Sequence, residues 1–109
     1  MIRIRYCRDR HCVTIEGHAG YSEIGAQDPV CAAVSALAYT LSANVMDLGE
    51  KGMVVNGVMR MHPGDSEISC KVVPGFEEDV ERVFETICLG FELLSSVFEK
   101  NIQYEAVVG

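Results

Sequence analysis

Apolar and polar residues alternate with a period of two in five short segments of the chain. Residues 2–6 alternate isoleucine or tyrosine with arginine, and residues 11–16 alternate valine and isoleucine with polar residues. Similar segments occur at 58–62, 67–73 and 102–108. This pattern is typical of strands with one buried face. Polar or Pro-Gly breaks join the first two and the next two segments, which predicts two β-hairpins and a last strand.

Two further segments repeat apolar residues at steps of three and four, which predicts two helices. The first begins at Asp28-Pro29, because Asp is a favoured N-cap and Pro is favoured at the first helical position. It ends at Gly49, since glycine commonly stops a helix. The second carries its apolar stripe through residues 76–98 and has an acidic first turn, which suits the positive end of the helix dipole.

The element order ββαββαβ predicts an α+β fold, with a single layer of mainly antiparallel sheet packed against two helices. Residues 17–27 contain three glycines and show neither period, so we expect a mobile loop there. Residues 49–57 are predicted to form a second loop. The length of 109 residues is enough for one core and too short for two, so we expect a single domain over residues 1–109.

Composition narrows the classes of function. The chain has 9 Lys and Arg against 16 Asp and Glu, a net charge of −7, and is 49% hydrophobic. This balance argues against disorder and against direct nucleic-acid binding, which needs clustered basic residues. Charged partners are expected to be basic. Residues 29–46 carry no charge and approach the length of a membrane span, but they include Ser35 and Thr40, so we expect a buried central helix and no membrane span.

Five cysteines form an odd set with no disulfide spacing, and no apolar run at the start could serve as a signal peptide. We therefore expect reduced thiols in the cytoplasm, four of them acting as small hydrophobic residues. His11 and Cys12 near Cys7 hint at a metal, but no second ligand pair with zinc spacing follows. We expect no metal and no cofactor. His62 precedes a turn and is expected to be exposed.

Candidate chemistry lies where the first loop meets the first helix. With Asp28 as N-cap, Cys31 falls in the first helical turn, where unpaired N–H groups and the dipole favour an anion. A free thiol has a pKa of about 8.5, and lowering a thiol pKa by two units requires about 2.7 kcal/mol. A helix end supplies at most roughly 2 kcal/mol. A second contribution is needed, and the imidazolium of His18 is the candidate.

This pairing predicts a Cys–His nucleophile, with the N–H groups of Cys31 and Ala32 stabilising an oxyanion. The carboxylate of Asp28 opposes this arrangement, since a nearby negative charge disfavours a thiolate and the carboxylate competes for the Cys31 N–H. The spacing alone also fits a plain alternative. A cysteine in an apolar helix most often packs, and a histidine before a loop, here His18, is most often a surface residue.

Gly17-His18-Ala19, a glycine-containing loop, and then Asp28-x-Val30-Cys31-Ala32-x-x-Ser35 together resemble the ribosomal-processing cysteine protease family, Prp. The resemblance covers essentially the whole chain. It implies that His18 and Cys31 are the catalytic pair and that Asp28 and Ser35 support them. It also implies that the loop containing Gly20, Tyr21 and Gly25 becomes ordered over substrate. Two features depart from the family pattern: Pro29 stands where Ile or Leu is usual, and the His-to-Cys interval is one residue longer.

The same resemblance implies a homodimeric cysteine endopeptidase that removes a short N-terminal extension from a large-subunit ribosomal protein. A second hypothesis is a non-catalytic, dimeric, ribosome-associated binding module for basic peptides. A third, a thiol redox sensor, requires a resolving cysteine near Cys31, and the sequence contains no CxxC motif.

Overall fold

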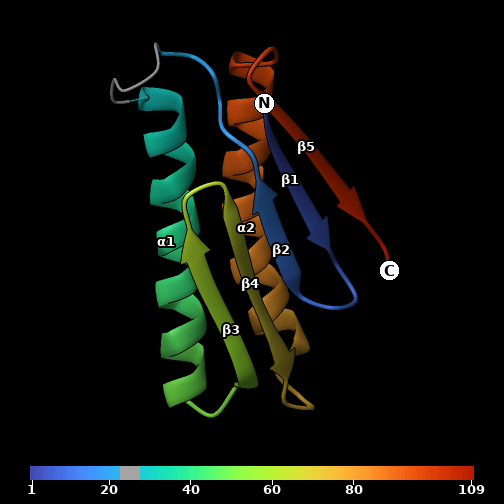
Figure 1. Cartoon of the computed structure of the whole chain (residues 1–109). Helices are drawn as coiled ribbons and strands as arrows, with labels where there is room; N and C mark the ends of the chain where they lie inside the picture. The colour runs from blue at the N-terminus through green and yellow to red at the C-terminus, as the bar shows by residue number, and fades with distance from the viewer. Residues whose placement is uncertain (23–27) are drawn as a thin grey trace.

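The computed structural model describes residues 1–22 and 28–109 and shows one five-stranded sheet packed against two helices (Figure 1). The predicted α+β fold and the order ββαββαβ are confirmed. The elements are β1 Ile2–Cys7, β2 Cys12–Glu16, α1 Pro29–Glu50, β3 Val54–His62, β4 Asp65–Val72, α2 Glu77–Val97 and β5 Ile102–Val107.

The strands lie in the order β3-β4-β2-β1-β5. Both hairpins are antiparallel, and β2 and β4 join them through a third antiparallel pairing. β5 runs parallel to β1, which a crossover connection such as α2 makes possible. Figure 1 shows both helices on the same side of the sheet, so the other side faces outward. The alternating burial of β1 and β4 follows from this, since one side chain in two reaches the helices.

The start of β3 differs from the prediction. The sequence pattern places residues 49–57 in a loop, but β3 begins at Val54. Its register with β4 shifts between Val55 and Val58, where Asn56 has a φ of 54°. Such a bulge leaves extra residues unpaired and breaks the period of two. The alternation therefore becomes regular only after the bulge.

Helix α1 begins as predicted, with Asp28 as N-cap and Pro29 in the first turn. Its buried residues follow helical spacing: Val30, Val34, Ala38, Leu41, Val45 and Leu48. By length and composition alone the helix could cross a membrane, with a mean hydropathy of 1.4. In this fold its buried stripe packs against the sheet and α2. The expectation of a central helix buried on several sides is wrong, because only 28% of the apolar window is buried and the opposite face of α1 is exposed.

Helix α2 completes the core. Phe84 and Phe91 are fully buried, and the ring of Phe84 stacks on that of Tyr6 with centroids 5.8 Å apart. Each buried phenylalanine contributes roughly 1.5–3 kcal/mol. This packing fixes the end of α2 and the turn that leads into β5. That turn carries Asn101, which reaches the candidate site.

Candidate active site

Asp28 joins the loop after β2 to the start of α1. Its Oδ1 accepts the N–H groups of Val30 (2.9 Å) and Cys31 (3.1 Å), while its Oδ2 accepts those of Tyr21 (3.1 Å) and Ser22 (3.4 Å). Partial burial opposes ionisation of the carboxyl, but the four donors outweigh it and hold the pKa of Asp28 below its usual range. The cap fixes Cys31 in the first helical turn, where the sequence predicts it.

The N–H groups of Cys31 and Ala32 are already occupied. The first donates to Asp28 Oδ1, and the second donates to the Asp28 carbonyl oxygen at 3.0 Å. In this arrangement neither group is free for its predicted role as an oxyanion donor, and that role stays a prediction. The physical reason is the competing cap, since an oxyanion here would have to displace a charge-assisted hydrogen bond.

The thiol of Cys31 is partly exposed and has a backbone donor. The N–H of Ala19 points at Cys31 Sγ, with an N···S distance of 3.4 Å. Ala19 is 3% exposed, and its carbonyl accepts a hydrogen bond from Asn101 Nδ2 at 2.9 Å. The residue that follows His18 is thus in direct contact with the candidate nucleophile.

The imidazole of His18 lies against the turn between β3 and β4. A Cβ added to Gly64 would stand only 2.8 Å from His18 Nε2, so the ring packs closely on this glycine. The N–H of Gly17 donates to the Gly64 carbonyl at 3.0 Å, which ties the end of β2 to the same turn. The turn is tighter than the predicted residues 63–66, because β4 already begins at Asp65.

One pocket of about 210 Å³ is lined by both members of the predicted pair, His18 and Cys31. Ser35, four residues after Cys31, lines it too, as expected for positions on one helical face. Apolar side chains from four elements form much of the remaining wall: Ile2, Ile15, Val34, Ala38 and Met61. The pocket therefore combines a thiol, an imidazole and an apolar surface.

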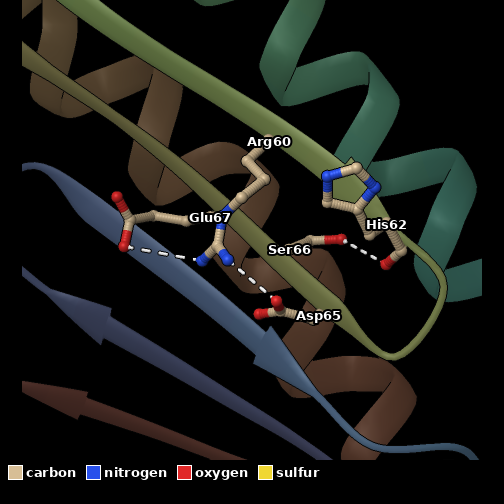
Figure 2. A network of polar contacts seen from close by, with 5 residues as sticks. All are labelled: Arg60, His62, Asp65, Ser66 and Glu67. Atoms are coloured by element: carbon tan, nitrogen blue, oxygen red, sulfur yellow. Dashed lines mark hydrogen bonds and ion pairs between the residues drawn. The ribbon is translucent and has the colours of Figure 1, made fainter.

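The end of β3 brings a second imidazole to this pocket. His62 lines it together with Asp65 and Ser66, and Ser66 Oγ donates to the His62 carbonyl at 3.3 Å (Figure 2). Figure 2 shows the His62 ring turned away from the ion pairs that Arg60 makes with Asp65 (2.8 Å) and Glu67 (4.0 Å). His62 is exposed, as expected, but no local pattern in the sequence indicates its position beside the site.

The predicted substrate loop is described only in part. Gly20 and Tyr21 belong to the described part. Gly25 lies outside the described residues, and so does the segment 23–27 of the loop that is predicted to be mobile. The ring of Tyr21 meets that of Phe98, just after α2, edge to face with centroids 5.7 Å apart. Residues 17–22 are tied to α1, to the β3–β4 turn and to the turn after α2.

The remaining cysteines are free and buried: Cys7, Cys12, Cys70 and Cys88. Burial raises the pKa of the Cys70 and Cys88 thiols to about 11 and raises that of Cys12 as well. All four side chains pack as small hydrophobic groups. Within residues 1–22 and 28–109, no cluster of three or more His, Cys, Asp or Glu side chains could hold a metal ion.

Three contacts of the site have no signal in the local sequence. They are the Ala19 N–H on Cys31, the Asn101 amide on Ala19, and the packing of His18 on Gly64. Asn101 is 82 positions from Ala19 along the chain. Only the path of the whole chain brings these residues together.

Comparison with known proteins identifies the family. The family model for the cysteine protease Prp matches residues 1–103. The chain belongs to the Prp family of cysteine proteases. The resemblance carried by the motif around His18 and Cys31 is thereby confirmed at the level of the family.

Solved structures share the Prp fold. The essential ribosomal processing protease Prp from S. aureus, in complex with a covalently linked product peptide, is 18% identical, has a TM-score of 0.74, and covers 98% of this chain and 100% of its own. The same S. aureus protease with a substrate peptide gives 16% identity, a TM-score of 0.66 and 97% coverage of both chains. A Streptococcus mutans protein is 24% identical, with a TM-score of 0.68 and coverage of 99% and 93%. No curated protein matches the chain.

Proposed function

We propose that this Prp-family chain is a cysteine endopeptidase in which Cys31 Sγ is the nucleophile and His18 the general base. One observation carries the proposal: both side chains line one pocket, and the Ala19 N–H donates to the Cys31 sulfur. That donor and the helix dipole both stabilise a thiolate at this position. Membership of a cysteine protease family supports the same assignment.

In this mechanism, His18 removes the proton from the Cys31 thiol, and the thiolate attacks the carbonyl carbon of the scissile peptide bond. The C–N bond then breaks, and the leaving amine takes the proton back from His18. Water hydrolyses the resulting thioester, which releases the new carboxyl terminus and restores the thiol. Asp28 acts by holding the helix start and the loop in register, and Ser35 lies on the pocket wall beside the nucleophile.

The proposed substrate is a large-subunit ribosomal protein with a short N-terminal extension, cleaved in the cytoplasm. The S. aureus relatives are described as ribosomal processing proteases in complex with peptides. The net charge of −7 would attract a basic ribosomal protein over long range. The apolar wall made by residues such as Val34 and Met61 suits apolar side chains of a bound peptide.

We also propose that the chain is a homodimer formed through α1. The exposed face of α1 carries small or apolar residues without charge between positions 29 and 46: Ala32, Ala36, Tyr39, Ala43 and Met46. Small residues allow two helices to approach closely, and the two larger side chains supply apolar area.

The deciding experiment incubates the chain with the extended ribosomal protein and measures the product masses. We expect cleavage by the natural chain, none by Cys31→Ala, and a loss of about 10²–10⁴-fold for His18→Ala, the usual size of a general-base contribution. Cys12→Ala is the matched control, because it removes a thiol from β2 outside the pocket. His62→Ala tests whether the second imidazole of the pocket, and not that of His18, is the general base.

Turnover by Cys31→Ala would refute the mechanism. Loss of activity in His62→Ala combined with full activity in His18→Ala would move the base to His62. Binding of the ribosomal protein without cleavage at any enzyme concentration, and unchanged in Cys31→Ala, would instead favour the non-catalytic binding module. The redox hypothesis lacks support, since of the five cysteines only Cys31 lines the described part of the pocket.

A further inference from the structure

Asn101 lies in the turn between α2 and β5 and is held on both sides by its backbone. Its N–H donates to the Phe98 carbonyl at 2.8 Å, and its own carbonyl accepts the N–H of Ile2 at 2.8 Å. The turn is therefore anchored to the end of α2 and to the start of β1. The side-chain amide of Asn101 projects from a fixed point in the fold rather than from a free loop.

The amide donates to the Ala19 carbonyl at 2.9 Å. Ala19 is buried, so its carbonyl needs a partner inside the protein. The N–H of the same residue donates to Cys31 Sγ. The carbonyl of Ala19 is thus held by Asn101, while the N–H of the same residue faces the candidate nucleophile.

We propose that Asn101 is a positioning residue for the Cys31 thiolate, and that it acts by holding Ala19 so that the Ala19 N–H points at the sulfur. This inference rests on the proposed role of Cys31 as nucleophile. Without the amide, the Ala19 carbonyl turns toward water and the N–H leaves the sulfur. The thiolate then loses a donor that stabilises its charge.

The test compares Asn101→Ala and Asn101→Asp with the natural chain. Asp has the shape of Asn, but its ionised carboxylate has no donor for the Ala19 carbonyl. Asn44→Ala is the matched control, because Asn44 Nδ2 makes the same kind of bond to the Thr40 carbonyl (2.8 Å) on α1, away from the pocket around Cys31. Asn101→Gln keeps a donor amide and serves as the conservative rescue.

The first measurement is the pH at which alkylation of Cys31 by iodoacetamide reaches half its maximal rate, followed on the Cys31 peptide by mass spectrometry. We expect this midpoint to rise by about one pH unit in Asn101→Ala and Asn101→Asp, the change expected for losing one hydrogen bond to a charged group. Asn44→Ala should leave it unchanged, and Asn101→Gln should restore at least part of it. In peptide cleavage, kcat should fall about tenfold with KM unchanged.

The outcomes separate this inference from the function on which it rests. A midpoint in both Asn101 variants equal to that of the natural chain would overturn the inference, even if their melting temperatures fall, because a merely structural tie would lower stability alone. Cleavage of the ribosomal substrate by Cys31→Ala would instead contradict the proposed nucleophile, whatever the midpoints of the Asn101 variants. If Asn101→Ala does not fold, the same-shaped Asn101→Asp carries the test.

Discussion

Asp28 shows how much a single residue at this site does. One carboxylate oxygen caps α1 and the other accepts two N–H groups of the loop. The cap is a local feature, and the Asp-Pro pair before an apolar stripe predicts it. The link to Tyr21 and Ser22 is less local, because it requires the loop to return to the helix start.

Two substitutions separate these roles. Asp28→Asn keeps one acceptor oxygen for the cap but replaces the other with an NH₂ donor, which cannot accept from the loop. Asp28→Ala removes both acceptors. Urea denaturation should therefore rank the stabilities as natural chain, then Asp28→Asn, then Asp28→Ala. Equal stability of Asn and Ala variants would show that the cap contributes nothing.

The same residue predicts a pH dependence with a definite sign. Because the pKa of Asp28 is lowered in the folded chain, its carboxylate stabilises the fold above the pKa of the unfolded residue, about 4. This contribution is lost as the pH falls through the lower folded value. In acid titrations, the difference in stability between the natural chain and Asp28→Asn should shrink as the carboxylate is protonated, and a constant difference would contradict the assignment.

At the residue scale, the sequence predicts those site residues that are placed by local geometry. Asp28 as N-cap and Cys31 in the first turn follow from their distance along one helix. The predicted oxyanion donors have partners within the same segment, since the cap uses the Cys31 N–H. The contact between Asn101 and Ala19 could not be predicted, because no local pattern in the sequence indicates it.

Among the elements, the β3–β4 turn has a role in the site beyond joining two strands. Gly64 has a φ of +74°, and the His18 ring occupies the space where a Cβ would stand. Gly52, in the turn after α1, has the same φ of +74° but no atom within 4 Å of its Cβ position. The two glycines thus share a backbone conformation and differ only in their surroundings.

We predict that Gly64→Ala and Gly52→Ala each lose roughly 1–2 kcal/mol of stability, because an L side chain is strained in the left-handed region. Only Gly64→Ala should also displace His18 and lower kcat/KM by more than tenfold. Denaturation curves measure the first effect and peptide cleavage the second. Equal kcat/KM values for the two variants would show that the turn does not hold His18.

The elements themselves were largely predictable, and the failures have a common cause. Strands and helices with an uninterrupted period were found within a few residues of their observed bounds. The start of β3 was missed because the bulge at Asn56 hides the alternation, and β4 began earlier than expected at Asp65. Local periodicity predicts which face of a segment is buried. It does not predict the bounds of a strand where pairing with a neighbouring strand overrides the apolar alternation.

For the whole molecule, the sequence predicts the layers but not their arrangement. The strand order β3-β4-β2-β1-β5 places the β3–β4 turn beside the end of β2, so that His18 meets Gly64. No pattern within one segment specifies which hairpin edges meet. The pocket depends on that choice, since its lining comes from both hairpins and from α1.

The surface of the proposed dimer is also a question for the whole molecule, because both helices expose apolar side chains. Tyr39 and Met46 on α1 are 61% and 56% exposed, and Leu93 on α2 is 59% exposed. The α2 face is acidic, with Glu85 and Glu92 beside its leucines. Two copies of a chain with a net charge of −7 would repel each other there, whereas the exposed α1 face carries no charge up to position 46.

We therefore predict that Ala36→Glu on α1 converts a dimer into a monomer, while Leu93→Glu on α2 does not. Both substitutions add one carboxylate to an exposed helical position, so their effects on charge are matched. Sedimentation equilibrium over a range of concentrations measures the outcome. A monomeric natural chain would refute the dimer, and dissociation by Leu93→Glu alone would move the interface to α2. Because α1 also presents Cys31, loss of cleavage activity on dissociation would show that the pocket needs the second copy.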